Sequence, residues 1–289
     1  MRRRQALAAA FLAVMPLCLA AGDLAAETVS VGGHDIWYHV EGQPAAGKPP
    51  VLLLHGGMMN TELTWSGLIP ILARDRMVIG IDQQGHGHSA DRDRPITLDS
   101  MRADTLAVLD TLGVDRVHVV GFSLGGMLGF ELATGNPGRV ASLTVISAPQ
   151  NNNGFLPELV EMNRDPGHTP SPGLIKRLPS PKELLEIRSS FQMQNPRGTG
   201  AIMPLMKKLR ALLASDWGWS DKQIAAIPAP VMIVIGDRDF IRPAHALHLH
   251  DIIAGSWLAI LPDTTHLDAP EHPALPGMLQ DRFETAENP

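Results

Sequence analysis

The chain has 289 residues, of which 44% are hydrophobic and 19% charged, and its formal net charge is −6 at pH 7. This balance is typical of a folded protein with a sizeable core, and it excludes a disordered chain or one embedded in a membrane. The chain after residue 26 is acidic and has no basic cluster, which argues against nucleic acid or anionic lipid as a partner.

The first 26 residues have the layout of a secretory signal peptide. Three consecutive arginines from Arg2 precede an apolar run, Ala6 to Ala21, and small residues continue to Ala26. The run is short and rich in alanine for a membrane span. We expect cleavage after Ala21 or Ala26, export to the periplasm or the medium, and a mature protein that no membrane holds. A retained N-terminal anchor helix is the alternative.

Removal of residues 1–26 would change the composition in two ways. It takes away three arginines and one aspartate, so the formal net charge goes from −6 to −8. It also takes away Cys18, the sole cysteine, and leaves no disulfide, thiol nucleophile or cysteine metal ligand. Any covalent catalyst must therefore be another residue type.

Short aliphatic and β-branched runs alternate with helical patterns along residues 27–289. This alternation predicts an α/β domain in which a mostly parallel, eight-stranded sheet is flanked by helices. The middle runs are almost continuously apolar, as expected for strands buried on both faces. The expected strands are residues 28–31, 35–40, 51–55, 77–81, 116–120, 142–147, 231–235 and 257–261. The expected helices are residues 61–73, 98–112, 124–134, 243–253 and 273–283.

The spacing of strands breaks between Ser147 and Val231. This long stretch carries helical patterns at residues 182–193 and 201–215. We expect a helical cap insertion at about residues 150–226, lying over one end of the sheet. Open α/β sheets bind ligands at the carboxyl ends of their strands, so the insertion is expected to cover the site.

The strongest chemical signal is Gly121-Phe122-Ser123-Leu124-Gly125, which follows one expected strand and opens the next helix. A serine on such a sharp strand-to-helix turn is held in a strained conformation with its hydroxyl exposed. Glycines two residues to either side leave room for the turn. Ser123 is therefore the candidate nucleophile.

A nucleophilic serine needs a base, and the base needs an orienting carboxylate. His266 lies in a loop directly after the last expected strand, which brings it to the end of the sheet where Ser123 sits. His272, at an expected helix start, is its nearest rival. Asp237 and Asp239 both follow the strand at residues 231–235; we favour Asp239, because it lies further into the loop and can reach across to a histidine.

Acyl transfer also needs an oxyanion hole, which is usually its largest electrostatic contribution. The backbone N–H of Leu124, just after the nucleophile, is one expected donor. The loop His55-Gly56-Gly57-Met58 should supply the second, from Gly57 or, failing that, from Met58. The ring of His55 is expected to brace this turn and to take no part in the chemistry.

Two groups of histidines invite a metal interpretation but lack the remaining ligands of a metal set. We interpret His86 and His88 as part of a glycine turn after a strand. His245, His248 and His250 are expected on one face of a solvated helix. No metal and no cofactor is expected.

Together these segments resemble the α/β-hydrolase superfamily, specifically its capped esterase, haloperoxidase and proline-iminopeptidase-like branch. Their order, serine then aspartate then histidine, is that of the superfamily. The resemblance implies that Ser123 is the nucleophile, His266 the base and acid, and Asp239 its orienter. The matching segments are His55-Gly56-Gly57, Asp82-x-x-Gly85-His86-Gly87-x-Ser89, Gly121-Phe122-Ser123-Leu124-Gly125-Gly126, Gly236-x-x-Asp239 and His266.

The expected function is hydrolysis of a small, apolar carboxylic ester through an acyl-enzyme. Members that open epoxides or remove halides use an aspartate nucleophile, and the carbon–carbon bond hydrolases resemble G-N-S-M-G, from which Phe122 and Leu124 depart. Amide, lactone or carbon–carbon cleavage, perhydrolysis on the same triad, and a binding protein that keeps the fold remain alternatives. The oligomeric state is not predicted.

Substrate character is indicated only by the residue types of the insertion. Methionines suggest a pliable apolar pocket, although they could merely pack the cap. Four glutamates could bind a substrate amino group, and Trp217 and Trp219 could stack on a substrate or seal the base of the cap. The methionines are Met58, Met59, Met162, Met193, Met203 and Met206, and the glutamates are Glu158, Glu161, Glu183 and Glu186.

Overall fold

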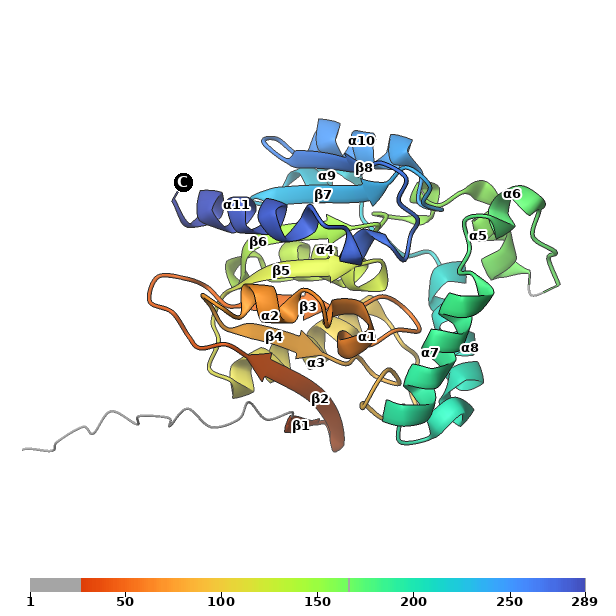
Figure 1. Ribbon diagram of the computed structural model, residues 1–289, viewed down its shortest axis with the longest axis horizontal. Coiled ribbons are helices and arrows are strands. Elements are labelled where there is room, and N and C mark those ends of the chain that lie inside the picture. The colour runs from red at the N-terminus through yellow and green to blue at the C-terminus, as the bar shows by residue number, and fades with distance from the viewer. Residues whose placement is uncertain (1–26, 166, 289) are drawn as a thin grey trace, which may run out of the picture.

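The computed structural model describes residues 27–165 and 167–288, so the predicted signal peptide lies outside the described residues. Eight strands form one sheet in the order β1-β2-β4-β3-β5-β6-β7-β8 (Figure 1). The pairs β1–β2 and β2–β4 are antiparallel, and the other pairs are parallel. All eight predicted strands are found, with ends within two residues of the prediction. Their bounds are Glu27–Val31, His34–Glu41, Val51–Leu54, Val78–Ile81, Val117–Phe122, Val140–Ile146, Val231–Gly236 and Trp257–Leu261.

Helices cover both faces of the sheet, which is why the central strands β3 to β7 are buried throughout. One face packs against α3 (Leu98–Thr111), α4 (Leu124–Gly135) and α10 (Pro243–Ile252). The opposite face packs against α11 (Leu275–Glu287) and two short helices near residue 65. Short 3₁₀ turns complete the connections at Pro137–Arg139, Asn152–Gly154, Gly198–Ala201 and Ala269–Glu271.

The predicted single helix at residues 61–73 is wrong. Two short helices replace it, α1 (Thr61–Trp65) and α2 (Ile69–Leu72). Gly67 weakens a helix, and Pro70 has no N–H to bond the preceding turn. The break bends the segment so that Trp65 and Leu72 both reach the core. The last helix is also displaced, since α11 begins and ends later than residues 273–283.

Five helices lie between β6 and β7, where the insertion was predicted. Four of them stand beside the arrowheads of the strands and form the cap (Figure 1). The fifth, α9, packs against α4 and α10, so the predicted span 150–226 includes a helix that belongs to the sheet layers. Their bounds are Pro157–Arg164 (α5), Pro172–Ile175 (α6), Pro181–Gln194 (α7), Ile202–Ala214 (α8) and Asp221–Ala225 (α9). None of the helices described is long and apolar enough to cross a membrane.

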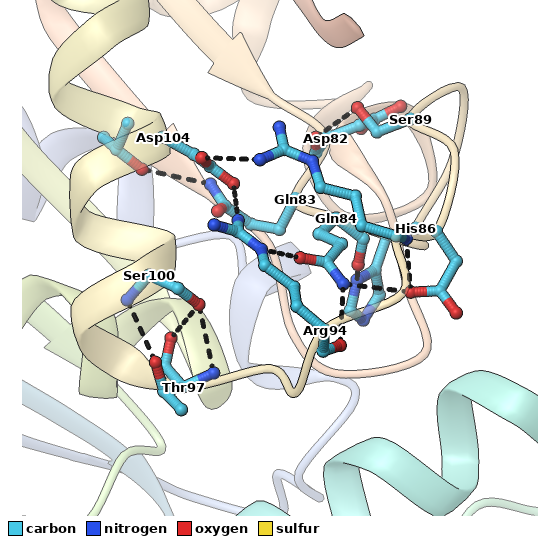
Figure 2. Close-up of polar contacts among 12 residues, drawn as sticks. Asp82, Gln83, Gln84, His86, Ser89, Arg94, Thr97, Ser100 and Asp104 are labelled. Atoms are coloured by element: carbon cyan, nitrogen blue, oxygen red, sulfur yellow. Dashed lines mark hydrogen bonds and ion pairs between the residues drawn. The ribbon is translucent and has the colours of Figure 1, made fainter. Parts of the chain in front are cut away.

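A polar network holds the loop that follows β4. Arg94 donates to the side chain of Gln84 at 2.7 Å and forms an ion pair with Asp104 (Figure 2). Gln83 donates to Thr105 at 3.2 Å. These contacts connect the loop to α3. Because both glutamines are buried, the network restricts the conformation of the loop.

The same loop anchors the cap. Asn195, at the end of α7, donates to the carbonyl oxygens of Gly85 and Gly87 at 3.2 and 3.0 Å. Lys208 of α8 forms an ion pair with Asp91 at 2.8 Å. The cap helices α7 and α8 are thereby held against one rim of the sheet.

A second buried polar cluster lies near the amino ends of β5 and β6. His118 donates through Nε2 to Glu287 at 3.0 Å and accepts at Nδ1 from the hydroxyl of Ser142 at 2.8 Å. Arg76 pairs with the same glutamate at 2.6 Å. The cluster fastens the end of α11 to the sheet.

Candidate active site

Ser123 occupies the bend between β5 and α4. Its φ of 51° and ψ of −116° lie in a region that residues other than glycine seldom adopt. Its backbone N–H donates to the carbonyl of Ile146 at 2.8 Å, which fixes the bend to the neighbouring strand. The side chain is half-buried and lines a cavity between the sheet and the cap. This is the geometry that the sequence predicted for a nucleophile.

Two glycines make this bend possible. A Cβ atom added to Gly121 would lie 2.2 Å from the carbonyl oxygen of Gly125. One added to Gly125 would lie 2.1 Å from the carbonyl oxygen of Leu54. Both distances are far inside van der Waals contact, so α4 can approach β3 and β5 only with glycine at these positions.

His266 and Asp239 form a buried pair beside this cavity. The imidazole Nδ1 lies 2.8 Å from Asp239 Oδ1, and in the neutral ring a hydrogen bond from Nδ1 to this carboxylate makes Nε2 the acceptor. The same carboxylate oxygen accepts from the backbone N–H of Ile241 at 2.8 Å. Both side chains are almost fully buried, so the pair is protected from competing water. The ring of His266 lines the same cavity as Ser123.

The structure separates Asp239 from its rival Asp237. Asp237 is exposed and accepts from the backbone N–H of Thr264 at 3.1 Å, and hydrogen bonds from that backbone hold its pKa below the ordinary value. It therefore positions the loop that carries the histidine. The rival histidine, His272, accepts from the N–H of Ala274 at 3.2 Å and does not line the cavity.

The predicted oxyanion donors lie side by side. A methyl group added to Gly57 would sit 3.8 Å from Cβ of Leu124. Within the described part of the chain, the N–H groups of Gly57, Met58 and Leu124 have no hydrogen-bond acceptor. All three residues line the cavity, so these amides are free for a substrate oxygen.

His55 braces the loop that carries Gly57. Its Nδ1 donates to the carbonyl of Gly56 at 2.8 Å, and its Nε2 accepts from the N–H of Gln83 at 3.0 Å. Burial lowers the pKa of His55, so the ring is neutral, as both hydrogen bonds require. The loops after β3 and β4 are therefore linked, and the network of Figure 2 supports the amides indirectly.

The cavity has a volume of about 510 Å³ and is lined mainly by apolar side chains. Of the methionines in the prediction, Met58, Met59, Met162 and Met206 line it. The other two do not, since Met193 is 74% and Met203 is 69% exposed on the outer face of the cap. This size and lining fit a small, largely apolar molecule.

Residues 49–170 match the family model of the alpha/beta hydrolase fold. The nucleophile bend and its glycines fall within that match. The chain has the α/β-hydrolase fold.

Known proteins with the same fold include enzymes of different names. A dihydrolipoyllysine-residue acetyltransferase component of an acetoin cleaving system, from Pseudomonas putida, is 30% identical over 76% of this chain and 59% of its own. A putative carbamate hydrolase of Azorhizobium caulinodans is 36% identical over 46% and 48%. The meta-cleavage product hydrolase of Pseudomonas fluorescens IP01 has a TM-score of 0.70 at 21% identity, over 90% and 98% of the two chains. The match thus spans about half to three fifths of the first two relatives.

The two tryptophans and the four glutamates named for the insertion all lie outside the lining of the cavity that contains Ser123. Trp219 is buried against Phe130, and Trp217 donates to Asn152 at 3.0 Å. Both seal the base of the cap and neither lines the cavity. Glu158 is engaged by Ser171, and no Asp or Glu among the described residues lines the cavity, which disfavours recognition of a substrate amino group there.

One predicted histidine face is wrong. His245 is buried, because its Nε2 accepts from the backbone N–H of Gln150 at 3.1 Å in the loop after β6. His248 pairs with Asp221 at 3.0 Å, and His250 contacts the hydroxyl of Ser256 at 2.9 Å. Each ring thus has a separate protein partner.

The rings of His86 and His88 likewise point to different partners. His86 Nδ1 bonds the carbonyl of Gln84 at 3.0 Å, whereas His88 bonds Asp82 at 3.1 Å and stacks on Trp37. No group of three potential metal ligands occurs within residues 27–165 and 167–288.

Most residues of the cavity lining were not identified from the sequence, and three of them carry a ring or a charge that bears on the chemistry. Phe240 stacks on His266 with ring centroids 3.8 Å apart and limits how the imidazole can rotate. Its place directly after Asp239 was a usable signal. Arg188 and Arg210 line the cavity from α7 and α8. Nothing in a helical pattern alone shows which face of a cap helix will turn toward the sheet.

Proposed function

We propose that this chain is a serine hydrolase that cleaves a small carboxylic ester through an acyl-enzyme intermediate. The observation that carries the proposal is the meeting of three features at one apolar cavity: the strained Ser123, the buried His266–Asp239 pair, and free amides at Gly57 and Leu124. Each feature supplies one requirement of acyl transfer.

In the first half-reaction, Ser123 Oγ attacks the ester carbonyl carbon while His266 Nε2 takes its proton. The carbonyl oxygen becomes an oxyanion, which the amides of Leu124 and of Gly57 or Met58 stabilise. The intermediate collapses when the carbon–oxygen bond to the alcohol breaks and His266 returns the proton to the leaving oxygen. The acyl group then remains on Ser123.

In the second half-reaction, water attacks the acyl-enzyme and His266 takes its proton. A second oxyanion forms in the same place, and its collapse returns the proton to Ser123 Oγ and releases the carboxylic acid. Asp239 remains ionised throughout, because its task is to orient the ring and stabilise the imidazolium.

The ester preference rests on the cavity lining. An apolar space of about 510 Å³ beside the serine favours a substrate with a small aliphatic or aromatic body. A panel of short- and medium-chain aryl esters should be hydrolysed by the wild type, and Ser123→Ala should lower kcat/KM by about 10⁴-fold or more. A fluorophosphonate probe should label the wild type at Ser123.

A second candidate is cleavage of a carbamate or of a carbon–carbon bond on the same triad. It is favoured by the names of the relatives, a putative carbamate hydrolase and a meta-cleavage product hydrolase. Turnover of carbamates or of vinylogous diketones above that of all esters would favour it. Tight binding of a small molecule that survives Ser123→Ala, with no turnover of any substrate, would instead indicate a binding protein.

We also propose that residues 1–26 direct export. Expression in a bacterial host should then yield a periplasmic or secreted protein whose first residue is Gly22 or Glu27, as determined by intact mass. An unprocessed product in the cytoplasm would contradict this.

A further inference from the structure

Two arginines face the apolar cavity from neighbouring cap helices. Arg188 of α7 lies on the same helix face as Leu184 and Ile187, which also line the cavity. Arg210 of α8 lies four residues after Met206, again on the lining face. Arg188 is exposed and Arg210 half-buried. Each of the two cap helices therefore contributes an arginine to the lining of the cavity that contains Ser123.

Neither arginine has a counter-ion in the part of the chain that the structure describes. Among the described residues, no side chain forms an ion pair or hydrogen bond with the guanidinium group of Arg188 or Arg210, and no acidic residue lines the cavity. Two other cations at the edge of the cap do have partners, since Lys208 pairs with Asp91 and Arg94 with Asp104. The two arginines together carry two uncompensated positive charges, with which an anionic ligand can pair.

The chemistry of guanidinium indicates what that ligand carries. Arginine binds carboxylates through two parallel N–H···O bonds, and charge-assisted bonds are stronger than neutral ones. Arg210 is half-buried, so water screens a contact at its guanidinium group less than it would at a fully exposed one. The cavity should thus hold an apolar chain that ends in a carboxylate.

The position of a second groove indicates which half of the ester carries the charge. This groove, of about 450 Å³, is lined by His266, Thr265 and Asp268 but not by Ser123, Arg188 or Arg210. His266 lines both the cavity and this groove, so an alcohol that it protonates can leave into the groove. The acyl half then occupies the cavity that contains the arginines.

Building on the proposed function, we infer that the substrate is a monoester of a dicarboxylic acid, whose free carboxylate is bound by Arg188 and Arg210 while Ser123 attacks the ester at the other end. Both arginines and the nucleophile line one cavity, so a single substrate molecule can contact all three.

The test compares p-nitrophenyl monoesters of adipic, pimelic and suberic acids with the same esters in which the free carboxylate is methylated. The wild type should favour the anionic member of at least one pair. Arg188→Gln and Arg210→Gln should each lower the ratio of kcat/KM, anionic over neutral, by about tenfold. Arg210→Lys, which keeps the charge, should restore part of the ratio.

Lys207→Gln is the matched control, because Lys207 is exposed on α8 and does not line the cavity. The substitution removes one positive charge, as Arg210→Gln does. It should leave the ratio unchanged. Calorimetry tests the contact without turnover. Monomethyl adipate should bind to Ser123→Ala, and it should bind more weakly to the double variant that carries both Ser123→Ala and Arg210→Gln.

The possible outcomes separate the two proposals. A wild type that prefers the neutral esters, or a ratio that both glutamine variants leave unchanged, overturns the dicarboxylate inference while the hydrolase proposal stands, and shows that the arginines only cover apolar surface. A wild type that hydrolyses no ester and is not labelled at Ser123 overturns the proposed function itself.

Discussion

The cavity has two walls of different construction. The sheet wall presents Gly57, Ser123 and His266, which are held by backbone sterics and buried hydrogen bonds. The cap wall presents Met206 and Arg210, which project from amphipathic helices. A change on the sheet wall disturbs the bend or its supports, whereas a cap side chain can be exchanged with little effect on the fold. We therefore expect substitutions on the sheet wall to change the rate of the reaction, and substitutions on the cap wall to change which substrate is preferred.

The sheet wall is tested most severely through the carboxylate. Asp239→Asn keeps the size of the side chain but removes its charge, so His266 loses the partner that selects its tautomer, and kcat should fall about 10⁴-fold. Asp237→Asn should stay within a few-fold of wild type, because Asp237 only supports the loop. Kinetics on one aryl ester suffice. The reverse result would transfer the orienting role to Asp237.

The buried histidines make the sheet domain sensitive to acid. Burial is the main cause that lowers the pKa of His118 to about 4, and that of His245 also to about 4. Because the unfolded chain binds these protons near pH 6.5, the free energy of unfolding should fall as the pH drops from about 6.5 to about 4, by at most about 3 kcal/mol per histidine.

A variant assigns part of this slope. Denaturant unfolding at several pH values should show a smaller slope for His118→Gln between pH 6.5 and pH 4, whatever its stability at neutral pH. Parallel curves for variant and wild type across that interval would mean that His118 does not contribute.

The cap wall should show the smallest effect. Met206→Ala removes an apolar side chain from the cavity and should lower kcat/KM for medium-chain aryl esters by about fivefold, or ~1 kcal/mol. Met203→Ala on the same helix is its matched control, since Met203 is exposed outside the cavity. Equal losses in both variants would show that the helix, not the side chain, matters.

The sheet wall could be predicted from sequence because its determinants are local. Ser123 is marked by its flanking glycines and by a strand before and a helix after it. Asp239 and His266 follow from the rule that parallel strands end at one edge of a sheet. Gly67 and Pro70 both indicate that residues 61–73 do not form one continuous helix. The prediction of a single helix gave more weight to the apolar periodicity of the segment.

The remaining features depend on packing between distant segments. His245 is buried and accepts a hydrogen bond from the backbone N–H of Gln150. The sequence around residue 245 gives no sign of this contact, because its partner lies far away in the chain. Arg188 and Arg210 look ordinary on amphipathic helices, and only the docking of the cap turns them inward. The position of α9 beside α4 and α10 likewise depends on packing between segments that are distant in the sequence.

The cluster at the other end of the sheet carries a practical consequence. Ser142, His118 and Glu287 repeat the residue types of a hydrolytic triad, with hydrogen bonds of 2.8 and 3.0 Å. Yet Ser142 is completely inaccessible, and none of the three lines a cavity described for residues 27–165 and 167–288. A reagent selective for activated serines should not label Ser142 in the folded protein, where the hydroxyl is inaccessible, or in the unfolded chain, where the hydrogen bond to His118 is lost, so Ser123→Ala should remain unlabelled in both states.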